Sequence, residues 1–175
     1  MPSDPLRYSM HATGHAGVAL LAYAPLGFAL LVLGTPELAF LGGLAMVALA
    51  SLPDFDLQVP FISHRGCTHT FGFVLLVGAA GWVTGTFLDQ HLAIASPGSL
   101  ATLGFVVGSL AILSHLAADA ITPMGIAPFW PLSSRRYTLS LVKAKNPVAN
   151  FALFGVGVFA TALTTFVAIQ FGFVS

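Results

Sequence analysis

Charged side chains are scarce in this chain of 175 residues. Only 7% of the residues are Asp, Glu, Lys or Arg, whereas soluble domains average about 25%. Hydrophobic residues make up 57% of the chain, and the mean hydropathy is +0.91. This composition argues against an ordinary soluble domain and predicts an integral membrane protein. The length suits a single domain that covers residues 1–175.

Four further absences narrow the possible classes of protein. The net charge is zero, so no bulk electrostatic attraction favours a nucleic-acid partner. The single cysteine, Cys67, excludes an internal disulfide and a zinc site built from paired cysteines. No HExxH pattern occurs, which argues against an intramembrane metalloprotease. No basic start followed by a small-residue cleavage pattern is seen, so we expect no removable signal peptide.

Long apolar stretches recur along the chain, and a bilayer core takes about 20 residues to cross as a helix. Turn residues or polar loops separate the stretches. The pattern predicts an all-α polytopic membrane protein with about five transmembrane helices in one bundle. The expected spans are Thr13–Leu33, Leu38–Leu52, His69–Leu88, Leu100–Ile121 and Val148–Val174.

Five spans place every basic side chain on the same side of the membrane as the N-terminus. Lys and Arg accumulate on the cytoplasmic side of membrane proteins. We therefore predict that the N-terminus is cytoplasmic in a multi-pass protein of the inner or plasma membrane. The basic residues are Arg7, Arg65, Arg135, Arg136, Lys143 and Lys145.

The stretch His64–Thr70 concentrates polar groups between two apolar runs. It holds two histidines, an arginine and two threonines within seven residues. Unpaired polar groups are costly in a membrane or a dry core. The stretch is therefore predicted to form part of a metal site at the cytoplasmic membrane face.

Other segments deliver His or Asp to the same face. Residues four apart on a helix share one side of it, and this spacing occurs at the start of the first span and the end of the fourth. Asp54 and Asp56 follow the second span, in a segment expected to be extended, where only one of them would face the site. The predicted metal ligands are His11, His15, His64, His69, His115 and Asp119.

These ligand types suit zinc, with manganese or iron as alternatives. The number of candidates favours either two ions or one ion with carboxylates that orient its histidines. Asp54 or Asp56 is expected to act as a ligand or as the general base. Arg65 lies between two candidate ligands and suits bidentate contact with a phosphate, although it also fits a simple topology signal. Cys67 is expected to be a packing residue.

Most of the candidate residues named above lie in five short sequence blocks, which together resemble the YdjM-like family of predicted inner-membrane metal-dependent hydrolases. The resemblance implies a multi-helix membrane protein whose metal site uses these histidines and aspartates, and it matches His15 better than His11. One departure is Leu57, where the family often has a histidine. The matching blocks are Thr13–His15, Leu52–Asp56, His64–Thr70, Ser114–Gly125, and Phe129–Leu132 followed by Arg135 and Arg136.

The leading hypothesis is a membrane-bound metal-dependent hydrolase. It would cleave a phosphoester of a lipid or lipid-linked substrate with a metal-activated water, and Arg65 would stabilise the phosphate charge. The alternative is a membrane metal-binding protein without catalytic activity, in transport, sensing or a structural role. Almost no ionisable side chains lie inside the spans, which argues against ion conduction.

Overall fold

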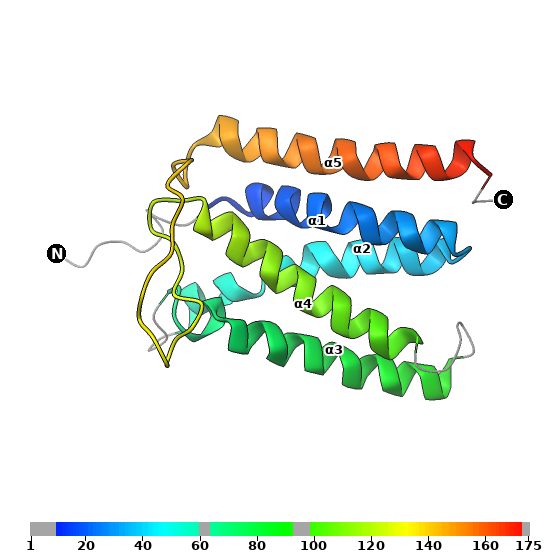
Figure 1. Ribbon diagram of the computed structural model, residues 1–175, viewed down its shortest axis with the longest axis horizontal. Helices are drawn as coiled ribbons and strands as arrows, with labels where there is room; N and C mark the ends of the chain where they lie inside the picture. The colour runs from blue at the N-terminus through cyan, green and yellow to red at the C-terminus, as the bar shows by residue number, and fades with distance from the viewer. Residues whose placement is uncertain (1–9, 60–63, 93–98, 173–175) are drawn as a thin grey trace.

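The computed structural model describes residues 10–59, 64–92 and 99–172. Five long helices dominate this part of the chain, and it contains no strand, only an isolated bridge between Ile126 and Tyr137. The predicted all-α fold is therefore confirmed. The helices are α1 (Ala12–Val32), α2 (Pro36–Ala50), α3 (Phe71–His91), α4 (Ser99–Ala120) and α5 (Pro147–Gln170), as Figure 1 shows.

All five helices are long and apolar enough to cross a membrane, when α2 is continued through the short 3₁₀ helix η2 (Pro53–Gln58). Their outward faces carry large exposed apolar side chains, such as Phe40, Leu76 and Phe159. Helices that are apolar on every side are typical of a bilayer environment. The predicted count of five spans is thus confirmed.

The third helix begins two residues later than predicted, at Phe71, because the side chain of Thr70 caps it. The Thr70 hydroxyl accepts a hydrogen bond from the Phe73 amide, which is the usual role of a threonine before a helix. His69 belongs instead to a second 3₁₀ helix, η3 (Cys67–His69). This places His69 outside the long helix, in the compact segment between α2 and α3.

Glycines allow the helices to approach backbone to backbone. A Cβ atom at Gly157 of α5 would collide with the backbone of Gly17 in α1, and one at Gly81 of α3 would collide with the backbone of Gly104 in α4. Small residues are favoured at helix interfaces in membranes because dispersion contacts replace the hydrophobic effect there. These contacts join α1 to α5 and α3 to α4.

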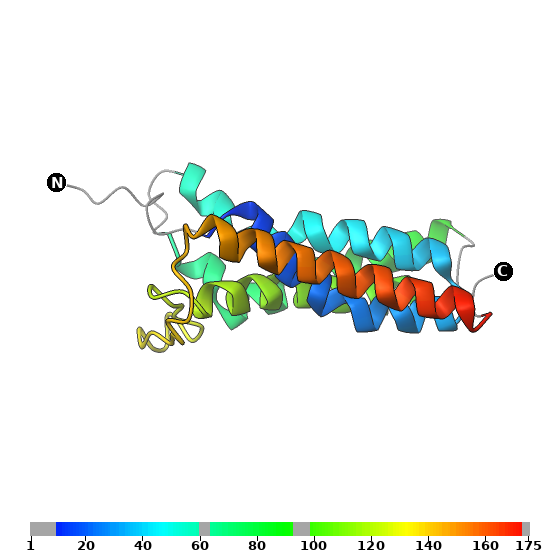
Figure 2. The ribbon, with the colours of Figure 1, turned by 90° about the horizontal axis from the view of Figure 1, so that it is seen from above.

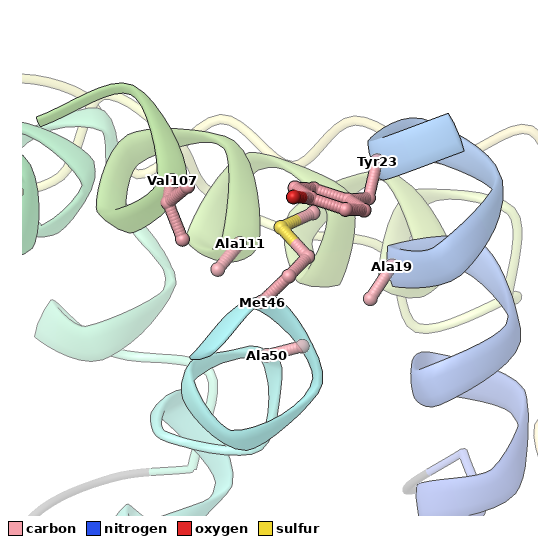
Figure 3. Packing of buried hydrophobic residues seen from close by; sticks show 6 residues of the cluster. All are labelled: Ala19, Tyr23, Met46, Ala50, Val107 and Ala111. Carbon is pink, nitrogen blue, oxygen red and sulfur yellow. The ribbon is translucent and has the colours of Figure 1, made fainter. Parts of the chain in front are cut away.

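The middle of the bundle is filled by one side chain from α2. Met46 is fully buried and points between α1 and α4 (Figure 3). It meets Tyr23 of α1, whose hydroxyl donates a hydrogen bond to the carbonyl of Ala39 at 2.6 Å. Ala111 of α4 closes the other side. The cluster holds α1, α2 and α4 together and supports the ends of the helices that carry the polar residues.

The polar segments gather at one end of the bundle. Figures 1 and 2 show the start of α1, η2, η3, the C-terminal end of α4 and the long connection before α5 together at that end. The described basic residues lie in these connections, and Arg7 lies outside the described residues. The basic residues at this end are Arg65, Arg135, Arg136, Lys143 and Lys145.

The expectation of an extended segment at Asp54 and Asp56 is wrong. Pro53 begins a 3₁₀ helix instead, in which both residues lie in the first turn. A 3₁₀ helix has three residues per turn, so side chains two positions apart point in different directions, about 240° around the axis. The two carboxylates consequently face different partners, and each has its own place in the site.

Candidate metal centre

Four segments, α1, η2, η3 and α4, meet at the polar end of the bundle and bring three buried histidines together. His15, His69 and His115 are at most 1% exposed. Each of the three lies at or near the end of a helix or in a short 3₁₀ helix, and these ends meet at the same end of the bundle. His15 lies on the first turn of α1, Asp54 and Asp56 on η2, His64 before η3, His69 at the end of η3, and His115 and Asp119 on the last two turns of α4.

Four atoms form the centre of the site. The Nε2 atoms of His69 and His115 are 3.1 Å apart. Asp119 Oδ2 lies 3.2 Å from the His69 nitrogen and 3.6 Å from the His115 nitrogen. Asp54 Oδ1 lies 3.8 Å and 3.6 Å from the same two nitrogens. Tetrahedral zinc with ligands at 2.0–2.1 Å separates its ligand atoms by about 3.3–3.4 Å, so these residues fit a divalent ion.

The hydrogen bonds of His115 and His69 leave both Nε2 atoms as acceptors. His115 Nδ1 lies 2.7 Å from the carbonyl oxygen of Ala50, which only accepts, so Nδ1 carries the proton. His69 Nδ1 lies 2.9 Å from the hydroxyl of Thr68, and that hydroxyl donates its own proton to Asp56. Two lone pairs that face each other at 3.1 Å repel unless a cation lies between them.

Asp56 holds the neighbouring groups rather than facing the centre. Its Oδ1 atom lies 2.8 Å from Nδ1 of His64, and its Oδ2 atom accepts hydrogen bonds from Thr68 and from the Arg65 amide. Asp56 is 3% exposed. A carboxylate behind a ligating histidine fixes the ring and its tautomer. Asp54 therefore lies among the potential ligand atoms, whereas Asp56 lies behind the rings of His64 and His69.

His15 flanks the centre on the other side. Its ring stacks on that of His115 with centroids 3.9 Å apart. Its Nε2 atom lies 3.8 Å from Asp54 Oδ2 and 3.8 Å from Asp119 Oδ1. Neither ring nitrogen has a hydrogen-bond partner, and buried polar atoms without partners are rare and costly. The unsatisfied nitrogens point to a ligand role for His15.

Three overlapping groups can therefore hold a metal ion. In each group the potential ligand atoms lie within 4.8 Å of one another. Oδ1 of Asp54, Nε2 of His64 and Oδ2 of Asp119 are also buried without a hydrogen-bond partner, as expected of atoms that a cation would satisfy. The groups are His15 with Asp54 and His115, Asp54 with His64 and His69, and His69 with His115 and Asp119.

Arg65 has several partners within the protein, and its contact with a phosphate stays a prediction. Its guanidinium is fully buried and pairs with Asp119 Oδ1 at 2.6 Å. It also donates to the hydroxyl of Thr122 and to the carbonyl of Gly125. Its backbone has a φ of 59°, which is uncommon for a residue other than glycine. Arg65 therefore fixes Asp119, so that one carboxylate oxygen is tied and the other faces the centre.

At both Arg65 and His69, burial and the neighbouring carboxylates shift the pKa in opposite directions. Burial lowers the pKa of Arg65, and the carboxylate of Asp119 works against that shift. Burial also lowers the pKa of His69, but the nearby carboxylates of Asp119 and Asp56 outweigh it and hold that pKa above the ordinary value. The carboxylates thus favour a positive charge at His69, which a proton or a metal ion supplies.

Some predicted residues lie outside the centre. His11 is exposed and precedes α1, where its amide donates to the side chain of Asn150, and it belongs to none of the metal-binding groups found among the described residues. Cys67 is exposed and has a free thiol. Sequence reasoning missed Thr68 as the link between His69 and Asp56, although its place in the polar stretch was a usable signal. It also missed the Ala50 carbonyl, for which no side-chain signal exists.

Comparison with known proteins gives one match. A family model described as YdjM inner membrane protein matches residues 10–174, which is nearly the whole chain. A search of curated proteins and a search of solved structures each found no significant match. The matched range includes every segment that contributes to the metal centre.

Proposed function

Because the chain belongs to the YdjM inner membrane protein family, we propose that this multi-pass membrane protein is a metal-dependent hydrolase of lipid or lipid-linked phosphoesters. We further propose that its polar end faces the cytoplasm, where the concentration of Lys and Arg would place it. The single observation that carries the proposal is the pair of Nε2 acceptors of His69 and His115, 3.1 Å apart beside Asp119.

The arrangement suits hydrolysis because most of its potential ligands are buried and one of them, Asp54, is partly exposed. His69 and His115 have fully buried side chains, whereas the side chain of Asp54 is 22% exposed. A catalytic metal site keeps a position for water or substrate, while a structural site fills all positions with protein. A divalent cation in such a site supplies an activated water and polarises a phosphoryl oxygen.

The residues of this chain divide the work. His69, His115 and Asp119 would hold the ion, and His15 and His64 each belong to a further potential ligand group with Asp54. Asp54, at the open side, is placed to bind the ion or to accept a proton from the attacking water. Asp56 and Arg65 orient the ligands through the hydrogen bonds described above.

A second candidate is a structural metal site in a protein without catalytic activity. The near-complete burial of His15, His69, His115 and Asp119 favours it. The partial exposure of Asp54 favours the hydrolase. The two candidates differ in what the metal does: a structural metal is required for folding, whereas removal of a catalytic metal abolishes turnover and leaves the bundle folded.

The test begins with the purified protein in detergent and a measurement of its bound metals. Hydrolysis of phosphatidate and of a water-soluble phosphodiester is then followed with and without chelator. We expect activity that chelator abolishes and metal restores, and that is lost in His69→Ala and Asp119→Ala. His91→Ala is the matched control, because His91 lies at the end of α3 away from the site. Full activity in metal-free protein, or in either site variant, would refute the proposal.

A further inference from the structure

An apolar groove runs along the bundle between α2 and α3. Both helices pack on α4, but among the described residues they have little contact with each other. The space between them has a volume of about 740 Å³. Its walls consist of aliphatic side chains, glycines and Phe73, and Thr84 is its one lining residue with a polar side chain. Leu41 and Leu76 line it and are more than half exposed, so the groove opens sideways into the bilayer.

One end of the groove adjoins the metal centre. Leu52 lines this end and precedes Asp54 by two residues. Phe73 also lines it, and its amide bonds the hydroxyl of Thr70, the residue after His69. Asp54 is also the partly exposed member of the ligand set. The groove therefore ends next to η2, which carries Asp54, and next to the start of α3, which follows His69.

The dimensions fit an extended hydrocarbon chain. Within α2 the lining residues run from Leu38 to Leu49, which at 1.5 Å per residue is about 17 Å of helix length. One leaflet of the hydrocarbon core is about 15 Å thick, so a chain that enters at the polar end has room along its whole length.

We propose that this groove binds one acyl chain of a phosphorylated glycerolipid and so delivers the head-group phosphate to the metal centre. The inference rests on the proposed function and adds to it the class of substrate and the place of its apolar part. Moving an acyl chain from the bilayer into an apolar groove brings little hydrophobic gain. The groove therefore acts by orientation: it holds the phosphate at the open side of the site.

The first experiment maps the groove directly. The protein is placed in nanodiscs that contain phosphatidate with a photoreactive group on one acyl chain, and labelled peptides are identified by mass spectrometry. We expect label on the groove faces of α2 and α3. Ala80→Trp should remove it, because Ala80 is exposed and lines the groove. Ala79→Trp is the matched control, since Ala79 is also exposed on α3 but does not line the groove.

The second experiment compares substrates. In Ala80→Trp, hydrolysis of long-chain phosphatidate should fall by at least about tenfold, the scale expected when a substrate is held out of position. Hydrolysis of a water-soluble phosphodiester should be unchanged, which also shows that the variant is folded. Thr84→Trp, which lies four residues farther from the site, should impair long-chain lipids more than short-chain ones.

The outcomes separate the inference from the proposed function. Equal labelling in Ala79→Trp and Ala80→Trp, or label spread evenly around the bundle, would overturn the groove assignment. Preference for a polyprenyl phosphate over phosphatidate, or cross-links from the groove to a second protein chain, would overturn the occupant. Specific groove labelling without hydrolysis of any phosphoester would support the groove and refute the hydrolase.

Discussion

Replacing Asp56 with asparagine tests how the metal centre is organised. The substitution keeps the size of the side chain and removes its charge. Both carboxylate oxygens face donors: Oδ1 faces Nδ1 of His64, and Oδ2 accepts from Thr68 and from the Arg65 amide. The NH₂ group of an asparagine would face one of these donors whichever way it turned. At least one of the supporting hydrogen bonds is therefore lost.

The size of the effect follows from this geometry. Loss of a carboxylate behind a ligating histidine costs 10–100-fold in metal affinity, or about 1.4–2.7 kcal/mol. Asp56 supports His64 directly and His69 through Thr68, so we expect Asp56→Asn to lie at the upper end of this range. Direct loss of a ligand in His115→Ala should be more severe.

The assay is competition for the metal with a chromophoric chelator, in detergent at fixed pH. Asp89→Asn is the matched control. Asp89 accepts hydrogen bonds from the amides of Leu100 and Ala101 at the start of α4, away from the site, so its loss should weaken folding but leave metal affinity unchanged. An unchanged affinity in Asp56→Asn would refute the orienting role. A loss as complete as that of His115→Ala would show that Asp56 binds the ion itself.

Three further predictions follow from other contacts. Arg65→Met should lower the free energy of unfolding of the metal-free protein by about 3–5 kcal/mol, because it leaves the Asp119 carboxylate buried without its cation. Added metal should recover part of this loss in unfolding titrations. Equal stability of the variant and the wild type without metal would contradict the prediction. Gly157→Leu should destabilise by about 1–3 kcal/mol or more, because its side chain would meet the backbone of Gly17, whereas Gly155→Leu, with open space around it, should be tolerated. Metal affinity should fall as the pH drops, because a proton on His69 competes with the metal. The fall should begin above the ordinary histidine pKa of 6.5, since Asp119 and Asp56 hold the pKa of His69 high. Chelator competition from about pH 8 to about pH 5.5 measures this, and a flat profile would exclude His69 as a ligand.

Much of the fold follows from composition and span counting. Apolar length alone predicts the helices, because no other open structure satisfies its backbone within a bilayer. The number of spans then fixes which loops share a side, which is why residues as distant as His15 and His115 could be assigned to the same end. The helix ends were less predictable. Thr70 caps α3 through a side-chain hydrogen bond, so the helix begins at Phe71. A helix that began at His69 would have the same apolar pattern, so the pattern alone does not locate the start.

The inner arrangement of the site was not predictable in the same way. The alternation Asp54-Phe55-Asp56 suggested an extended segment, but Pro53 at the first position favours a helical turn. The partners of Arg65 include the Gly125 carbonyl, and the partner of His115 Nδ1 is the Ala50 carbonyl. Backbone carbonyls have no signature in side-chain identity. The pattern therefore indicated which residues meet but not which of them touch the ion.

Charge balance limits how many ions the centre holds at rest. When the histidines bind a metal they are neutral. Asp54, Asp56 and Asp119 then provide three negative charges, and Arg65 provides one positive charge within the same network. Two negative charges remain, and uncompensated charge is expensive in so buried a site. One divalent cation neutralises them, whereas a second would need an accompanying anion. A phosphate group is such an anion, so metal analysis should give one ion per chain alone and a second only with phosphate or vanadate present. Two ions without any added anion would show that the histidines or carboxylates carry different charges from those inferred here.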